Sequence, residues 1–220
     1  MIFFDNAVYL HIPKTGGSSF EMMCEQRHGI KVFGDQHNTA RDIPQTHRDK
    51  WIFGFIRDPM FAEYSNFRYH KFSWGGNDKF DFDSWCEWRY TDKPEEYGYE
   101  LGLSETQVEY GYRFNIRPQA GYFCDEDGKC LADGVYRYEQ IAEDLPAIGE
   151  KLGLDCLIDG FQGMQYDWSR GNEKYKDNIT HRSIEIMREA KGVDFMLHSL
   201  PGKVRTDFIL PTVPNYAYSR

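Results

Sequence analysis

The stretch HIPKTGGSSF, residues 11–20, decides the fold that we expect for this chain. The run NAVYLHI, residues 6–12, leads into it and has the length and apolar character of a buried strand. The loop that follows contains Gly16 and Gly17, which let the backbone turn tightly and approach a ligand closely. The order of strand, glycine loop and helix start predicts a backbone cradle for an anion.

A helix is expected over residues 18–28. Ser18 and Glu21 have the spacing of a capping box at its start, and Gly29 is suited to its end. The first amides of such a helix lack intrahelical partners, so they are free to bind a phosphate in the loop. Lys14 adds a full positive charge, and hydroxyl donors follow at Thr15, Ser18 and Ser19.

This loop differs from the phosphate-binding loop of ordinary ATP and GTP sites. That motif, GxxxxGK[ST], places its lysine after the second glycine. Here Lys14 precedes both Gly16 and Gly17. The order of residues therefore argues against a standard nucleoside triphosphate site.

The stretch FIRDPMFAEYSNF, residues 55–67, is the second informative segment. Arg57 follows the apolar strand WIFGFI, and Ser65 lies about two turns into the helix after it. Ligands of open α/β sheets bind beyond the carboxyl ends of the strands. We therefore expect Arg57 and Lys14 to meet the same ligand, with the guanidinium fork on a terminal phosphate.

The rest of the chain alternates between strand and helix signals, which predicts a parallel α/β sheet. Asp58 and Pro59 have the residue types of a helix N-cap and first helical position. The expected elements are a strand at 31–34, a loop with a short helix at 35–50, a strand at 51–56, helices at 59–72, 81–90 and 104–112, a hairpin of 119–123 and 129–138 turning at Asp127-Gly128, and helices at 139–152 and 180–197.

Together these segments resemble the sulfotransferases that use 3′-phosphoadenosine 5′-phosphosulfate (PAPS), above all the carbohydrate branch with heparan sulfate 2-O-sulfotransferases and their bacterial relatives. The likeness rests on PKTGGSS (13–19) and on the Arg57 segment. It continues through QHNTARDI (36–43), YFCDEDGKCLADGVYRYEQI (122–141) and KYKDNITHRSIEIMREAKGVDF (174–195).

The resemblance implies a three-layer fold like that of the P-loop NTPases, with a central parallel sheet between helices. It implies that Lys14, Thr15, Gly16, Gly17, Ser18 and Ser19 bind the 5′-phosphosulfate, and that Arg57 and Ser65 bind the 3′-phosphate. PAPS would be the co-substrate, with the desulfated nucleotide PAP as product and no metal ion. The acceptor would be a hydroxyl group, expected on a carbohydrate, although lipid, peptide and small-molecule hydroxyls stay open.

The acceptor hydroxyl needs a base near neutral pH, which suits histidine. His37 is the first choice, because it matches the segment of the family that carries the base. His70 is the second choice, and Glu21 is a rival because some sulfotransferases use a carboxylate. His11 is expected to pack beside the loop.

The aromatic stretch 73–118 has two interpretations. In the first, the stretch forms the acceptor side of a single domain of residues 1–220, and Trp74, Trp85 and Trp88 stack on sugar rings. In the second, its aromatic side chains belong to the hydrophobic core. Trp85 and Trp88 are three residues apart on an expected helix, so core packing is favoured for them.

Composition narrows the class of protein. The chain has 35 acidic and 26 basic side chains, for a formal net charge of −9. This balance disfavours nucleic acid as a partner. No apolar run has the roughly 20 residues needed to span a bilayer, and no signal peptide is recognised, so we expect a soluble, cytoplasmic protein. The odd, scattered set of five cysteines favours free thiols, with Cys124 and Cys130 as the only pair that a hairpin would bring together.

Three functions stay open on the residues alone. The first is PAPS-dependent sulfuryl transfer, the second is ATP-dependent phosphotransfer of the kinase type, and the third is nucleotide binding without catalysis. The lysine order in the loop weighs against the second function.

Overall fold

The computed structural model describes residues 1–30, 37–73, 81–108, 117–154 and 178–199. Within these residues, one sheet has the strand order β1 (Ile2–Phe3), β2 (Ala7–Leu10), β3 (Trp51–Ile56) and β4 (Gly134–Arg137). β1 pairs antiparallel with β2, whereas β2, β3 and β4 run parallel. The α/β architecture with a mostly parallel sheet flanked by helices is therefore confirmed.

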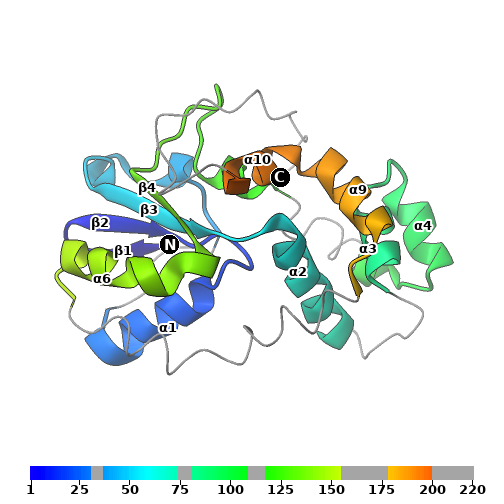
Figure 1. Ribbon diagram of the computed structural model, residues 1–220, viewed down its shortest axis with the longest axis horizontal. Helices are drawn as coiled ribbons and strands as arrows, with labels where there is room; N and C mark the ends of the chain where they lie inside the picture. The colour runs from blue at the N-terminus through cyan, green and yellow to red at the C-terminus, as the bar shows by residue number, and fades with distance from the viewer. Residues whose placement is uncertain (31–36, 74–80, 109–116, 155–177, 200–220) are drawn as a thin grey trace.

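Two helices cover one face of the sheet. They are α1 (Gly17–His28) and α6 (Ile141–Leu152), which lie side by side below the strands in Figure 1. Apolar side chains of both helices, such as Phe20 and Ile148, pack with Tyr9 and Phe53 of the strands in one buried cluster. Each of these helices ends at a glycine with a left-handed backbone, Gly29 and Gly153, and the sequence predicts the first of these ends.

The other face of the sheet is covered by short elements and by the helix α10 (Gly192–Ser199). The short elements are 3₁₀ helices, of which Ala40–Asp42 (η1) and Gln119–Tyr122 (η3) contribute to this core. Gln45–His47 (η2) and Tyr138–Gln140 (η4) are two more such turns. The residues of β3 are nearly all buried, because the strand lies between the two layers.

A second core lies at the opposite end of the molecule, on the right in Figure 1. It is built by α2 (Pro59–Ser73), α3 (Phe82–Tyr90) and α9 (His181–Ala190), with α4 (Pro94–Glu100) beside α3. Trp85 and Trp88 are completely buried in it, so these two rings are core residues. Among the described residues, no helix is both long and apolar enough to cross a membrane.

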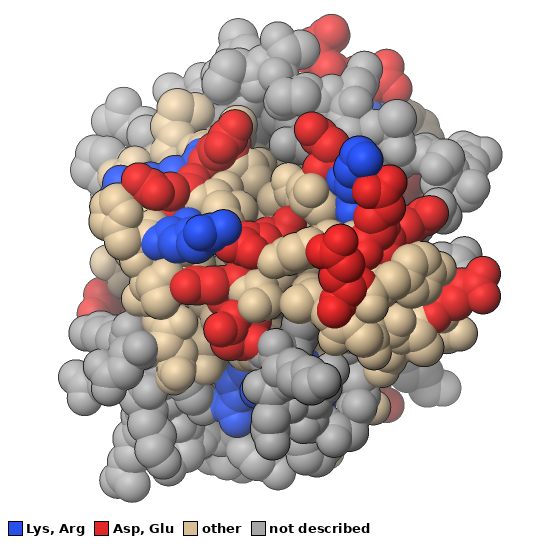
Figure 2. All heavy atoms as spheres, turned by 90° about the vertical axis from the view of Figure 1, so that its right-hand side faces the viewer, with Lys and Arg blue, Asp and Glu red and all other residues tan. Residues whose placement is uncertain are grey.

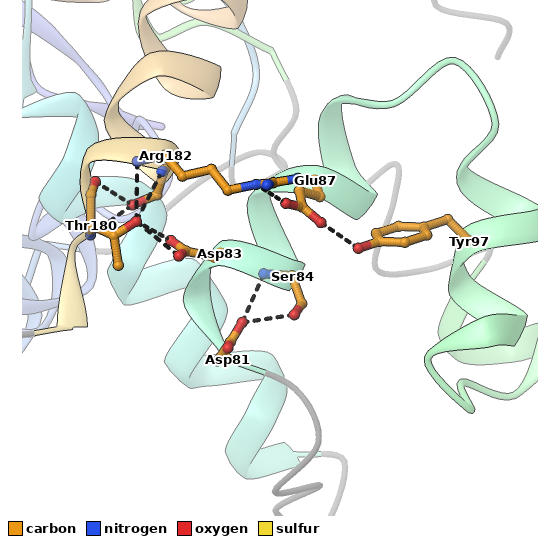
Figure 3. Close-up of polar contacts among 8 residues, drawn as sticks. Asp81, Asp83, Ser84, Glu87, Tyr97, Thr180 and Arg182 are labelled. Atoms are coloured by element: carbon orange, nitrogen blue, oxygen red, sulfur yellow. Dashed lines mark hydrogen bonds and ion pairs between the residues drawn. The ribbon is translucent and has the colours of Figure 1, made fainter.

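Polar contacts between helices close this second core at its surface (Figure 3). The Thr180 hydroxyl lies 2.8 Å from each carboxylate oxygen of Asp83, which joins the start of α9 to α3. The Glu87 carboxylate contacts both the Arg182 guanidinium and the Tyr97 hydroxyl. One carboxylate of α3 therefore holds both α9 and α4.

Three sequence predictions are wrong in detail, and one helix was missed. The Ser18–Glu21 capping box is absent, because the helix starts one residue earlier, after Gly16, and Glu21 turns inward to His11. The expected strand at 119–123 is largely the 3₁₀ helix η3, whose first amides donate to a carboxylate of α10. The helix expected over 180–197 is two helices, and α4 was not predicted at all.

The break between α9 and α10 has a visible cause. Lys191 leaves the helical region, with φ −126° and ψ 31°, and glycine follows it. The Lys191 side chain is buried, and its ammonium lies 3.7 Å from the Glu63 carboxylate of α2. The contact with Glu63 favours a bend at Lys191, where the sequence pattern alone predicts that the helix continues.

The turn at Asp127-Gly128 is confirmed. Gly128 has φ 79°, and the Asp125 carboxylate accepts from the Lys129 amide at 2.8 Å. The turn places Cys124 opposite Cys130 in an antiparallel bridge, and both are free thiols.

Several predictions fall outside the described residues. These are the strand at 31–34, Trp74, and the second half of the helix at 104–112.

Glu63 is the centre of a buried polar cluster that joins the helices of the second core. Its carboxylate lies 2.8 Å from the Arg89 Nε and accepts from the Trp85 indole at 2.7 Å and the Tyr90 hydroxyl at 3.0 Å. Burial alone would raise the pKa of Glu63, but the Arg89 and Lys191 charges and these hydrogen bonds outweigh it and hold the pKa below its usual value. Glu63 is therefore ionised inside the protein.

We expect Glu63→Ala to destabilise the protein by about 3–5 kcal/mol, because it leaves the Arg89 charge buried without its carboxylate. Glu96→Ala is the matched control, since the side chains of its pair with Lys93 are 68% and 70% exposed, and such pairs contribute at most about 1 kcal/mol. Urea denaturation measures both. Equal losses for the two variants would contradict the role of Glu63.

Candidate functional site

The loop after β2 has an unusual backbone, in which two residues adopt the left-handed conformation. Lys14 has φ 64° and Gly16 has φ 87°, both in the left-handed region. A lysine there is strained, since a Cβ atom disfavours this conformation. The Thr15 hydroxyl donates to the Ile12 carbonyl at 2.9 Å, which braces the loop from inside. Its proton is thus used within the loop.

Neither loop glycine has room for a side chain. A Cβ atom at Gly17 would lie 2.0 Å from the His11 ring, and one at Gly16 would lie 2.3 Å from the Tyr138 ring. Gly16 also serves as N-cap of α1, and its carbonyl accepts from the amides of Ser19 and Phe20. The backbone amides of Gly17 and Ser18 come before these two, at the start of the helix. Amides at this position have no intrahelical partners, and the helix dipole favours negative charge beside them.

Lys14 is half-buried beside α2 rather than extended into water. Its ammonium lies 4.6 Å from the centre of the Tyr69 ring, a cation–π contact that links the loop to α2. Burial lowers the pKa of Lys14 to about 8, with repulsion from Arg57 acting in the same direction and attraction to Glu63 opposing it. The lysine is therefore still charged at neutral pH and loses its charge just above it.

Arg57 reaches the same loop from the end of β3. Its Nη1 donates to the Lys14 carbonyl at 3.3 Å, and its guanidinium lies 5.0 Å from the centre of the Tyr138 ring. The carboxyl ends of the parallel strands β2 and β3 thus bring two cations together, as the sequence predicts.

The backbone of Arg57 is held by a side chain from a distant part of the sequence. The Gln119 amide accepts from the Arg57 N–H at 2.8 Å and donates to the Arg57 carbonyl at 2.9 Å. Asp194 of α10 accepts in turn from the amides of Gln119 and Ala120. A chain of buried hydrogen bonds therefore fixes the arginine from the far side of the sheet.

The serines of the site lie at the surface of the two helices. Ser18 is exposed and Ser19 half-buried in the first turn of α1. Ser65 is half-buried on α2, four residues before Tyr69, so it shares a helix face with the ring below Lys14. These positions suit hydroxyls that would meet a ligand at the loop.

His37 lies next to the loop, on the side of β2. Its Nδ1 is 3.1 Å from the His11 carbonyl, and its ring packs edge-on against the His11 ring. Because the carbonyl can only accept, Nδ1 carries the proton and Nε2 is left as an acceptor. Burial lowers the pKa of His37, and the bond to the His11 carbonyl opposes this only in part. The ring is therefore neutral at pH 7.

The other candidate bases have structural partners. The Glu21 carboxylate lies 2.8 Å from the His11 Nδ1, underneath the loop, and is 5% exposed. His70 is completely buried, its ring is stacked on Trp85, and burial lowers its pKa to about 4.

Sequence reasoning missed Tyr69, Gln119, Tyr138 and Asp194. Tyr138 lies inside a segment that the resemblance covers, but nothing local marks it as a neighbour of Gly16. Gln119 and Asp194 are 62 and 75 residues from their partners in the chain. No spacing rule connects residues so far apart.

A wider cleft lies at the other end of the molecule, between α3, α4 and α9. Its lining includes Glu87, Asp92 and Glu189, and Figure 2 shows carboxylates gathered over this face. Its two arginines are already paired, Arg89 with Glu63 and Arg182 with Glu87. This surface repels phosphates, so the loop after β2 is the better anion site.

Comparisons with protein-family models, with curated proteins and with solved structures found no match for this chain. The function of the site must therefore be inferred from its own geometry.

We expect Gly17→Ala to destabilise the protein by about 1–3 kcal/mol, because the added methyl collides with the buried His11 ring. Gly192→Ala is the matched control, since it also opens a helix and a Cβ there meets nothing within 4 Å. It should be neutral or stabilising. Thermal or urea unfolding distinguishes them, and a Gly17 variant as stable as the control would show that the loop is not packed against His11.

Proposed function

We propose that this chain is a sulfotransferase that moves a sulfuryl group from PAPS to an acceptor hydroxyl. The proposal is carried by the hydrogen bond from Arg57 to the carbonyl of Lys14. This contact brings a guanidinium, an ammonium and the start of α1 around one loop. Such a set suits a ligand with two phosphate groups, which PAPS has and a simple phosphate ester lacks.

The resemblance to PAPS-dependent sulfotransferases supports the same function, because the positions that it assigns to the nucleotide lie around this loop. In the proposed fold the three layers correspond to those of the P-loop NTPases, with the lysine placed before the glycines. PKTGGSS would then bind the 5′-phosphosulfate, while Arg57 and Ser65 bind the 3′-phosphate.

The proposed reaction is an in-line displacement at sulfur. The acceptor oxygen forms a new bond to sulfur while the bond from sulfur to the phosphate oxygen breaks. Negative charge develops on that phosphate as PAP leaves, and Lys14 and the amides at the start of α1 stabilise it. In this proposal the Lys14 ammonium rests on the Tyr69 ring, close to the loop, until the nucleotide binds. It then moves from the ring to the bridging oxygen.

The proton of the acceptor hydroxyl goes to His37 in this proposal. Its Nε2 is the free acceptor, and its lowered pKa keeps it unprotonated at neutral pH. Glu21 fits this role less well because its carboxylate is engaged with His11 beneath the loop. A carbohydrate hydroxyl is the acceptor that the resemblance implies.

Nucleotide selectivity tests the proposal directly. PAP should raise the melting temperature of the protein, whereas ATP should do so much less. Arg57→Ala should weaken PAP far more than adenosine 5′-phosphate, which lacks the 3′-phosphate. Equal weakening of both ligands would show that Arg57 does not bind the 3′-phosphate. Stabilisation by ATP alone would contradict the sulfotransferase proposal.

Lys14→Ala should lower the turnover of PAPS by on the order of 10²–10³, the usual loss for one stabilising donor.

Affinity for PAP should fall as pH rises through about 8, because Lys14 loses its proton there. Lys14→Arg is the control, since its guanidinium stays charged and should remove this pH dependence. A wild-type affinity that is constant from pH 7 to 9 would refute the role of the ammonium.

His37→Ala and Glu21→Gln separate the candidate bases. We expect the His37 change to remove the rise of the rate with pH that a titrating base produces, while the Glu21 change keeps that rise. The measurement is the pH–rate profile with PAPS and a hydroxyl acceptor. A normal profile for His37→Ala would transfer the role to another group.

A further inference from the structure

Two polar side chains are buried together beneath the anion loop, between β2 and α1. His11 follows the last residue of β2 and is 3% exposed, and Glu21 of α1 is 5% exposed. The His11 Nδ1 lies 2.8 Å from a carboxylate oxygen of Glu21. Burying such groups costs free energy even when they pair. A polar pair that is kept in the core next to the proposed base points to a role in the chemistry of that base.

The ring of His11 is held along two edges. Glu21 lies at its Nδ1 edge. The other edge faces the start of α1, because a Cβ atom at Gly17 would lie 2.0 Å from Cδ2 and 2.3 Å from Nε2 of the ring. The ring therefore fills the space that a side chain at Gly17 would need. Its Nε2 faces the backbone under the loop, so His11 itself is poorly placed to reach an acceptor hydroxyl.

His37 depends on His11 for its orientation. Its Nδ1 donates to the His11 carbonyl at 3.1 Å. The two rings meet edge-on, with their centres 4.8 Å apart and an angle of 75° between their planes. His37 has φ 76°, a conformation that a Cβ atom disfavours and that surrounding contacts must maintain. A change in the position of His11 would therefore move His37 as well.

The charge of Glu21 also acts on His37. Burial lowers the pKa of His37 most, and repulsion from His11 and from the ammonium at the start of the chain acts in the same direction. The bond to the His11 carbonyl and the attraction of Glu21 raise this pKa. Tyr9 and Cys24 also interact with Glu21, but burial raises the pKa of both groups, so they are neutral at pH 7. Glu21 is thus a negative charge that favours the protonated form of His37.

The proposed reaction gives this attraction a use. When the acceptor oxygen attacks sulfur, its proton moves to the Nε2 of His37, and the ring becomes an imidazolium with a proton on each nitrogen. A buried positive charge is costly unless a negative charge lies nearby. Glu21 keeps its own charge throughout, so it stabilises the imidazolium without taking the proton. That proton passes to water after the sulfated product and PAP have left.

We propose that Glu21 and His11 are positioning residues for the proposed base. Glu21 accepts from the Nδ1 of His11 and fixes the ring, and the His11 ring and carbonyl hold His37 with its Nε2 toward the acceptor. The buried carboxylate stabilises the charge that His37 gains. The inference rests on the proposed function, since it takes His37 as the group that receives the proton.

Histidine side-chain NMR tests the electrostatic part of the proposal without any ligand. In protein with isotope-labelled histidine, Glu21→Gln should move the titration midpoint of His37 to lower pH, because the attraction that favours the imidazolium is lost. Glu25→Gln is the matched control, since it removes the same charge one turn later on α1, where the side chain is exposed and screened by water. An unmoved or raised midpoint in Glu21→Gln, or equal shifts in both variants, would overturn the proposal.

The pH–rate profile with PAPS and a hydroxyl acceptor tests the positioning part. Glu21→Gln keeps an oxygen that accepts from His11 but lacks the charge, so the rise of the rate should shift to lower pH and reach a lower plateau. His11→Ala should lower turnover by on the order of 10², the loss expected when a catalytic group is misplaced by about 1 Å. His11→Asn should recover part of this loss, because its amide can donate to Glu21 in place of Nδ1. Wild-type turnover in His11→Ala, or no recovery in His11→Asn, would contradict the positioning role.

Binding of PAP separates this inference from the proposed function. The Glu21 and His11 variants should keep the rise in melting temperature that PAP gives the wild type, because neither side chain is assigned to the nucleotide. If PAPS is turned over but the midpoint of His37 does not respond to Glu21, this inference alone fails. If PAP does not bind the wild type, the proposed function fails, and the NMR titration still reports whether Glu21 acts on His37. Should His11→Ala not fold, the titration of Glu21→Gln decides.

Discussion

The carboxylate of Glu63 is the constraint on which the arrangement of the helices depends. It is 3% exposed and remains ionised because Arg89, Lys191, Trp85 and Tyr90 surround it. A buried charge is tolerated only with such partners. One side chain of α2 therefore fixes α3 and the junction of α9 with α10, and it also lines a narrow cleft beside Lys14.

The junction held by Glu63 leads directly to the candidate site. Lys191 ends α9, and Asp194, three residues later, holds the amides of Gln119 and Ala120. Gln119 then fixes the backbone of Arg57, whose guanidinium contacts the Lys14 carbonyl. The second core is thus connected to the anion loop by a series of buried polar contacts and the first turn of α10.

Several features of the site are costly to stability. Lys14 has a left-handed backbone and a partly buried charge, His37 has φ 76°, and the Asn66 amide, in the cleft beside Lys14, is unsatisfied among the described residues. Strained backbone and unpaired polar groups tend to gather where a protein binds ligands. Their convergence on one edge of the sheet is an independent reason to place function there, and the carboxylates at the opposite end of the molecule (Figure 2) leave this edge as the one suited to anions.

The sequence alone determined the local elements of the site. The apolar run, the glycines and the Asp58-Pro59 pair predict β2, the loop, α1, β3 and α2, because backbone preferences act between near neighbours. Only the tertiary structure decided how these elements are held. It turned Glu21 from a capping role to His11, divided the helix of 180–197 at Lys191, and recruited Gln119 to Arg57. The physical reason is the same each time: a buried polar group takes whichever partner packing brings to it. For Lys191 and Gln119 that partner lies far away in the chain.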